Sequence, residues 1–257
     1  MPLASDLLEQ AASELIARRK SGQPGPRLPE PCRPADLEDG WQLQQEVTRR
    51  LGLPIGGWKA ALPSPGKLVV APIYAPTISC AAVCSLPFVM DTDSVNVEPE
   101  LAFILNDALP VRAHAYTEAE VDAAVGSVHA ALEICASRYN NPAELAFPEL
   151  LGDGLVNGGL WLGPALTTTA LPDVSAFELT WASGNEPAMK VQARHPDGDP
   201  RAPLYWLVNF LRARGLGLQS GQAVITGSYA GVLALPSRQR VKFDYGELAC
   251  FEVEFGA

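Results

Sequence analysis

The chain has 257 residues, of which 47% are hydrophobic and 19% charged, a balance typical of a globular protein with a full core. Its net charge of −10 argues against a nucleic-acid partner. No apolar run approaches the roughly 18–20 residues that a membrane span needs, and the acidic residues near the N-terminus argue against a signal peptide.

Two amphipathic helices are predicted at the N-terminus. Residues 5–20 and residues 36–51 carry apolar side chains at helical spacing, and the intervening residues 22–34 are rich in proline and glycine, as in a loop. The strand patterns begin after this region. We therefore expect an N-terminal helical segment, residues 1–56, followed by a catalytic domain, residues 57–257.

The first strand pattern, residues 57–62, is apolar except for Lys59. Lysine is rarely buried unless it is paired. On spacing alone, the favoured interpretation is that Lys59 extends its ammonium group to the surface. The alternative is a lysine held near acidic groups, where it would bind an anionic substrate or move a proton.

Residues 95–105 predict a strand with two carboxylates on one face. Glu98 and Glu100 are two residues apart, about 6.5–7 Å along a strand, and Ala102 continues their face. Burying both carboxylates unpaired is costly, and a hard divalent cation such as Mg²⁺, Mn²⁺ or Ca²⁺ would remove that cost. Taken alone, the pattern favours a solvated edge strand, where Pro99 is tolerated.

Another carboxylate, Glu133, stands inside the apolar run of residues 130–137 and needs a partner there. It is either a third ligand for the same cation or the partner of a nearby arginine, and the pattern alone slightly favours the arginine. Arg138 follows this run, at a position more typical of a structural salt bridge than of catalysis.

The C-terminal part is predicted to alternate strands and a helix. The strand of residues 223–225 runs into Thr226, Gly227 and Ser228, whose hydroxyls and backbone N–H groups suit a carboxylate, although a plain turn is an equal alternative. The other predicted elements are a hairpin of residues 177–182 and 188–193, a helix of residues 201–214, and a closing hairpin of residues 241–243 and 248–255.

Common catalytic motifs are missing from the sequence. It has no Walker loop, no GxGxxG, no GxSxG elbow and no HExxH. Its five cysteines are odd in number and lack zinc-site spacing, which predicts reduced thiols in a cytoplasmic protein.

Several segments, in this order, resemble the fumarylacetoacetate hydrolase superfamily and, within it, the 2-keto-4-pentenoate hydratase branch. The resemblance extends from about Trp41 to Phe255. Its most specific part is Val-Glu-Pro-Glu-Leu-Ala around Glu98 and Glu100, followed by Ala-Leu-Glu-Ile-x-x-Ser-Arg around Glu133. The other segments are Gly57-Trp58-Lys59, Trp206-Leu207-Val208-Asn209 and Ile225-Thr226-Gly227-Ser228.

The resemblance implies an α+β fold, a mixed β-roll with flanking helices. It implies a Mg²⁺ or Mn²⁺ ion held by residues matching Glu98, Glu100 and Glu133, and proton movement by the residue matching Lys59. For the substrate, a small 2-oxo or dienol acid, we expect contacts from Arg138 and from the Thr-Gly-Ser turn of residues 226–228. The implied reaction adds water to a 2-hydroxy-2,4-dienoate and gives a 4-hydroxy-2-oxo acid, in an enzyme built of several identical subunits.

Two departures from the family pattern keep other reactions open. The family's Glu-Pro-Asp segment is replaced by Ala71-Pro72-Ile73, and its Asp-Asn-x-Ser segment corresponds to residues 153–156, Asp-Gly-Leu-Val. The alternatives are a 4-oxalocrotonate-type decarboxylase, an acylpyruvate C–C hydrolase and a catalytically impaired oxo-acid-binding protein. The hydrolase ranks lower because superfamily hydrolases generally use an early histidine, and none precedes His114.

Overall fold

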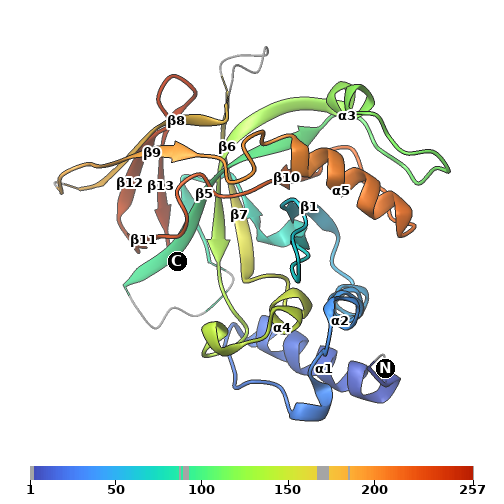
Figure 1. Cartoon of the computed structure of the whole chain (residues 1–257). Helices are drawn as coiled ribbons and strands as arrows, with labels where there is room; N and C mark the ends of the chain where they lie inside the picture. The colour runs from blue at the N-terminus through green and yellow to red at the C-terminus, as the bar shows by residue number, and fades with distance from the viewer. Residues whose placement is uncertain (1–2, 87, 89–92, 167–173, 185, 257) are drawn as a thin grey trace.

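Figure 1 shows the computed structural model of the chain, which describes residues 3–86, 88, 93–166, 174–184 and 186–256. These residues form an α+β fold with five α-helices and two β-sheets, as the sequence predicted. The helices are α1 (Ser5–Ser21), α2 (Leu37–Leu51), α3 (Glu118–Ala124), α4 (Phe147–Gly152) and α5 (Ala202–Ala213).

The large sheet has the strand order β2-β1-β10-β5-β6-β7-β3, with β11 paired to β5. Its strands are β1 (Ile55–Ala60), β2 (Val70–Tyr74), β3 (Ile78–Ser79), β5 (Ser94–Leu105), β6 (Val125–Cys135), β7 (Asn157–Ala165), β10 (Ala223–Ile225) and β11 (Leu233–Pro236). The small sheet has the order β4-β13-β12-β8-β9, and comprises β4 (Val83–Cys84), β8 (Ala176–Ser183), β9 (Met189–Arg194), β12 (Arg240–Asp244) and β13 (Cys250–Phe255). These strands confirm both predicted hairpins.

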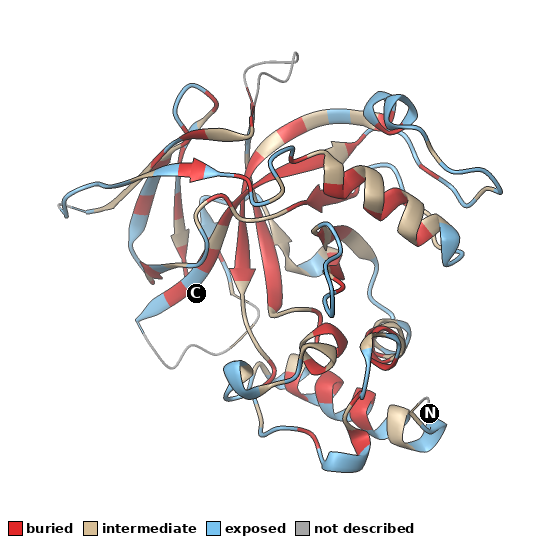
Figure 2. Cartoon of the chain, in the orientation of Figure 1, coloured by how far each residue is buried: buried red, intermediate tan, exposed pale blue. Residues whose placement is uncertain are grey.

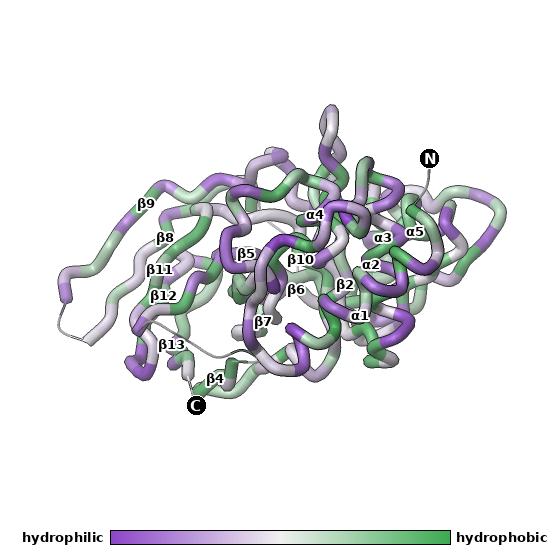
Figure 3. The backbone as a smooth tube through the Cα atoms, turned by 90° about the horizontal axis from the view of Figure 1, so that it is seen from below, coloured by the Kyte–Doolittle hydropathy of each residue, from purple (hydrophilic) through white to green (hydrophobic). Residues whose placement is uncertain are grey.

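The helices α1 and α2 begin and end within one residue of the predicted bounds. The side chain of Asp36 accepts a hydrogen bond from the backbone of Asp39 and caps α2, and Gly52 ends α2 in the left-handed conformation. Leu15 of α1 packs with Leu43 of α2 in a separate apolar cluster. Seen from below in Figure 3, α1 and α2 lie on one side of the molecule, and β4, β8, β12 and β13 lie on the other.

The strand β5 lies in the middle of the large sheet. It pairs with β6 on one side, and on the other side with β10 through residues 102–104 and with β11 through residues 94–97. Pro99 falls in the gap between β10 and β11, where its carbonyl accepts a hydrogen bond from Tyr229 N and no ladder donor is required of it. The interpretation of this stretch as a solvated edge strand is therefore wrong.

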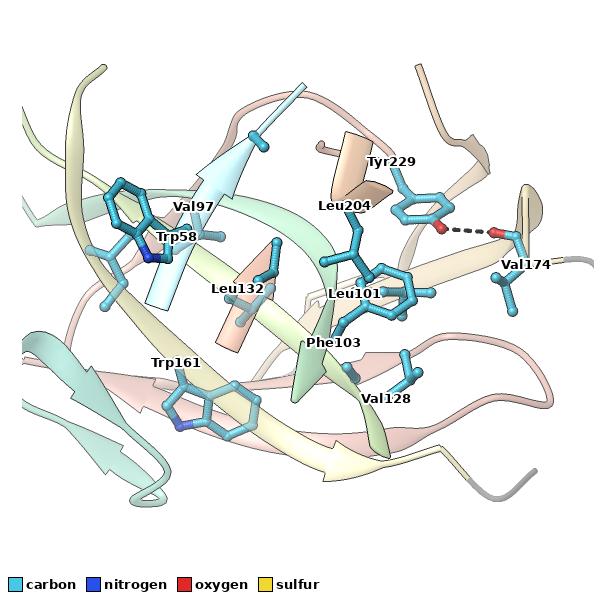
Figure 4. Close-up of a cluster of buried hydrophobic side chains, with 14 of the residues drawn as sticks. Trp58, Val97, Leu101, Phe103, Val128, Leu132, Trp161, Val174, Leu204 and Tyr229 are labelled. Carbon is cyan, nitrogen blue, oxygen red and sulfur yellow. Dashed lines mark hydrogen bonds between the residues drawn. The ribbon is translucent and has the colours of Figure 1, made fainter. Parts of the chain in front are cut away.

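The two faces of β5 enter different apolar clusters. Leu101 and Phe103 point into the main core, together with Trp58 and Leu132, as Figure 4 shows. Ala102 and Ile104 point the other way and pack with Ala131 and Ile225. Both faces are covered, so the central strands are mostly buried in Figure 2. In the described part of the chain, no helix combines the length and the apolar character needed to cross a bilayer.

Candidate metal centre

Three glutamates from the two central strands meet on one face of the large sheet. Glu98 on β5 lies directly opposite Glu133 on β6, and Glu100 lies two residues farther along β5. Directly opposed residues share a face, with Cβ atoms about 4.5–5.5 Å apart. One carboxylate oxygen from each glutamate lies within 4.8 Å of the others. The structure thus brings together the three residues that were predicted as metal ligands.

The cluster is largely shielded from solvent. Glu100 is 2% exposed, Glu133 is 0% exposed, and Glu98 is half-buried. Burial raises the pKa of Glu98 and of Glu100, and the neighbouring charge of Glu133 raises both further. Three carboxylates this close repel one another unless a cation compensates them.

Lys59 lies on the same face and is not at the surface. In the register of the sheet it is paired with Ile225 of β10 and Ala71 of β2. Its Nζ donates to Glu133 Oε1 at 2.6 Å and to the carbonyl of Leu155 at 3.3 Å. Burial by itself lowers the pKa of Lys59, but the charges of Glu133 and Glu98 outweigh burial and raise it overall. The surface interpretation of Lys59 is therefore wrong, and Glu133 pairs with this lysine instead of an arginine.

Backbone and amide donors orient two of the carboxylates. The backbone N–H of Gly227 donates to Glu100 Oε2 at 2.7 Å, and the amide of Asn157 donates to Glu133 Oε1 at 2.8 Å. The other oxygen, Glu133 Oε2, is buried and has no hydrogen-bond partner among the described residues. A buried carboxylate oxygen without a donor is costly unless something else binds it.

The donor set suits a hard divalent ion. All three groups are carboxylates, which Mg²⁺, Mn²⁺ and Ca²⁺ prefer over nitrogen or sulfur ligands. When all three carboxylates are ionised, they and the single ammonium of Lys59 carry a net charge of two negative units, which one such ion would neutralise. The unpartnered oxygen of Glu133 offers a ligand atom that has no hydrogen bond to give up.

The predicted substrate-binding turn lies next to the cluster. Thr226 directly follows β10, and Gly227 reaches Glu100 through its backbone, as described above. The hydroxyl of Ser228 donates to the carbonyl of Gly231 at 2.9 Å. Nε2 of His195, a buried histidine that sequence reasoning left unassigned, lies 3.2 Å from the carbonyl of Thr226. This turn therefore orients the carboxylate of Glu100 through the backbone N–H of Gly227.

Arg138 is placed differently. Its guanidinium donates to Asp153 Oδ1 at 2.6 Å and to the carbonyls of Asp153 and Asn157. It lines a cavity of about 230 Å³ beside Arg19 and Tyr74, and none of the three clustered glutamates lines that cavity. Its role in substrate binding stays a prediction.

The positions of the two missing family acids face the same site. Ala71 lies opposite Lys59 in the register of β1 and β2, and Ile73 packs in the apolar cluster on the carboxylate face. Both residues are 0% exposed. The wall of the site beside Lys59 is therefore apolar where the family pattern places two carboxylates.

Sequence reasoning missed Asn157 and the carbonyl of Leu155. Leu155 belongs to the turn before β7 and Asn157 is the first residue of β7, and they reach the cluster only because β7 is hydrogen-bonded to β6 beside Glu133. The sequence indicates the turn, but no local pattern shows which strand the side-chain amide of Asn157 faces.

No family model matches the chain. The chain is 27% identical over 147 residues to a 2-hydroxyhexa-2,4-dienoate hydratase of Comamonas testosteroni, covering 57% of this chain and 54% of that protein. It is 28% identical over 144 residues to 2-keto-4-pentenoate hydratase 2 of Dechloromonas aromatica, covering 56% and 54%. The match spans about half the length of each of these curated relatives.

Solved structures resemble the chain over a greater length. The 4-oxalocrotonate decarboxylase from Pseudomonas putida G7, complexed with magnesium and adipate, covers 98% of both chains with a TM-score of 0.75 at 16% identity. A protein assigned to the fumarylacetoacetate hydrolase family from Yersinia pestis CO92 gives a TM-score of 0.54 at 16% identity, covering 79% of this chain and 93% of that one. At such identities the likeness establishes the fold alone.

Sequence and fold therefore agree. The matched stretch is similar in sequence to hydratases, and the decarboxylase structure shares the architecture over 98% of the chain. The predicted resemblance is confirmed: the chain has the fold of the fumarylacetoacetate hydrolase superfamily, and its sequence is similar to that of the 2-keto-4-pentenoate hydratases.

Proposed function

We propose that the protein is a divalent-metal-dependent lyase that adds water to a 2-hydroxy-2,4-dienoate and releases a 4-hydroxy-2-oxo acid. The observation that carries the proposal is the buried cluster of Glu98, Glu100 and Glu133 with Lys59 bound to it. The hydratases among its curated relatives support the choice of reaction. An assembly of several subunits is part of the same proposal.

In this proposal Glu98, Glu100 and Glu133 hold Mg²⁺ or Mn²⁺. The magnesium-bound decarboxylase of the same fold supports the choice of a divalent ion. When bound, the ion supplies a Lewis acid that stabilises the negative charge developing on the 2-oxygen of the substrate.

The chain's own groups then bind the substrate and move its proton. Lys59 is held in place by Glu133 and by the carbonyl of Leu155, and its ammonium group donates a proton to C5 of the dienol. The proton of the 2-hydroxyl returns to Lys59, which leaves the 2-oxo-3-enoate and restores the ammonium group. Water then adds across the 3,4 double bond, with its hydroxyl on C4 and its proton on C3.

The hydroxyls of Thr226 and Ser228 hold the substrate carboxylate. The N–H of Gly227 already donates to Glu100, and the Ser228 hydroxyl exchanges its hydrogen bond to the carbonyl of Gly231 for one to the substrate. The apolar residues around the cluster exclude bulk water and so strengthen these polar contacts.

The test measures turnover of 2-hydroxypenta-2,4-dienoate, which is monitored as the loss of the ultraviolet absorbance of this substrate. We expect hydration with Mg²⁺ or Mn²⁺ and none after EDTA treatment, with activity restored by adding either ion in excess. Turnover that persists after the metal has been removed, as verified by elemental analysis, would contradict the proposal.

A second candidate is decarboxylation of 4-oxalocrotonate or a similar unsaturated 2-oxo diacid, and the apolar wall at Ala71 and Ile73 favours it. In decarboxylation the bond to the leaving carboxylate breaks, carbon dioxide departs, and the electron pair passes to the substrate's conjugated 2-oxo group to form an enolate. A divalent ion held by the glutamates would stabilise that enolate, and Lys59 would supply the proton that converts it to the 2-oxo product. Decarboxylation does not need an additional carboxylate to activate water. Release of carbon dioxide from 4-oxalocrotonate, without hydration of the dienoate, would establish this reaction in place of the first. A metal-binding protein that turns over neither substrate would be a binding protein only.

Replacing the lysine tests its role in either reaction. Lys59→Met keeps an unbranched side chain only one atom shorter but removes the ammonium group and its protons, so we expect kcat to fall by about 10²–10⁴-fold, the usual contribution of a proton-transfer group. The protein should still bind Mn²⁺, because its three carboxylates remain. Lys242→Met, an exposed lysine on β12, is the control and should keep wild-type activity. Full activity in Lys59→Met would show that another group moves the proton.

A further inference from the structure

The turn that leads into β7 has an unusual backbone. Gly154, Leu155 and Val156 all have positive φ angles, of 85°, 55° and 62°. For a β-branched residue such as Val156 this conformation is a genuine outlier. Such backbone persists only where the surrounding structure fixes it, and it is concentrated at functional sites.

Two arginine side chains hold this turn. Arg138 donates through its guanidinium to Asp153 Oδ1 and to the carbonyls of Asp153 and Asn157, at 2.6–2.8 Å, so both ends of the turn are tied to one side chain. Arg19 of α1 adds a hydrogen bond to the carbonyl of Asp153 at 2.6 Å. Arg138 and Asp153 are both buried, which makes these contacts difficult to exchange for water.

The turn presents two groups to the candidate metal centre. The carbonyl of Leu155 accepts from Lys59, and the amide nitrogen of Asn157 lies 2.8 Å from Glu133 Oε1 and 3.4 Å from the carbonyl of Gly159. Both neighbours of that nitrogen are acceptors, so the NH₂ group of Asn157 must face them. Asn157 is 3% exposed, so water has little access to compete for these bonds.

The two carboxylate oxygens of Glu133 therefore differ in their hydrogen bonding. Oε1 accepts from both Lys59 and Asn157, while the buried Oε2 has no donor among the residues that the structure describes. Because both donors bind the same oxygen, they fix the rotation of the Glu133 carboxylate about its Cγ–Cδ bond. We infer that Asn157 is a positioning residue that turns Glu133 Oε2 toward the divalent ion, an inference that rests on the proposed metal site. Hydrogen bonds from outside the ligand set commonly tune metal affinity in this way.

The test measures Mn²⁺ affinity directly, by calorimetry and by the electron paramagnetic resonance of free Mn²⁺. Asn157→Leu has nearly the same volume but no donor, and we expect the dissociation constant for Mn²⁺ to rise about 10–100-fold, as for other residues that orient a ligand. Asn157→Ser, whose shorter side chain does not span the gap to Glu133, should give a similar rise and serves where the leucine variant folds poorly. The control is Asn209→Leu on α5, where the amide binds the backbone of Tyr116 away from the cluster. It should retain wild-type affinity whatever its melting temperature.

The outcomes separate the two proposals. If wild-type protein binds Mn²⁺ and both Asn157 variants bind it equally well, the positioning role is overturned while the metal site stands. If Asn209→Leu weakens binding as much as Asn157→Leu does, the effect is a general loss of packing, and the positioning role is again overturned. If wild-type protein binds no Mn²⁺, the metal site fails, and the inference about Asn157 fails with it.

Discussion

Glu133→Gln is expected to abolish binding of the divalent ion and to lower kcat/KM by about 10³-fold or more. The glutamine retains an oxygen that can accept from Lys59 and Asn157, so the change removes chiefly the negative charge and one ligand atom. A Lewis acid contributes several kcal/mol to stabilising the transition state, and each 1.36 kcal/mol corresponds to about tenfold in rate.

The measurements are Mn²⁺ calorimetry and steady-state kinetics on the preferred substrate. Glu178→Gln is the matched control, because Glu178 lies on β8 and its partner is the exposed Lys190. It should retain both affinity and rate. Unchanged metal affinity in Glu133→Gln would show that Glu133 is not a ligand. A normal rate without bound metal would remove the basis for a metal-dependent reaction.

Arg138→Met is expected to destabilise the fold more than any surface substitution. The ion pair between Arg138 and Asp153 has side chains that are 7% and 0% exposed, and removing one partner leaves the other buried and charged. Breaking a buried pair in this way costs about 3–5 kcal/mol of unfolding free energy, or a fall of about 10 °C in melting temperature for a chain of this size.

This experiment also decides between two roles for Arg138. If the guanidinium only holds the turn of residues 153–157, the folded variant should bind Mn²⁺ more weakly through the loosened Asn157, while KM measured at saturating metal should stay close to that of the wild type. A raised KM with an unchanged melting temperature would establish the predicted contact with the substrate instead. Arg49→Met is the control, since Arg49 pairs with Glu46 on the exposed surface of α2 and its loss should leave the melting temperature nearly unchanged.

Local patterns determined much of the fold. The helices α1 and α2 follow from apolar spacing with glycine at their C-terminal ends, because helical periodicity and capping depend on residues within a few positions of each other. The common face of Glu98 and Glu100 follows in the same way from the two-residue period of a strand. The resemblance to the superfamily then singled out Lys59 and Glu133 as further candidates.

The surroundings of these residues were decided only by the tertiary structure. Spacing alone favoured a solvated edge for Glu98 and Glu100 and a surface position for Lys59. The first interpretation failed because β5 is flanked by β6, β10 and β11, and the second because β1 lies between β2 and β10 and directs Lys59 to Glu133. The register that sets Glu133 opposite Glu98, and the turn that brings Asn157 to Glu133, join residues 24 or more positions apart. Strand order, register and burial arise from packing across the whole chain, so no short stretch of sequence specifies them.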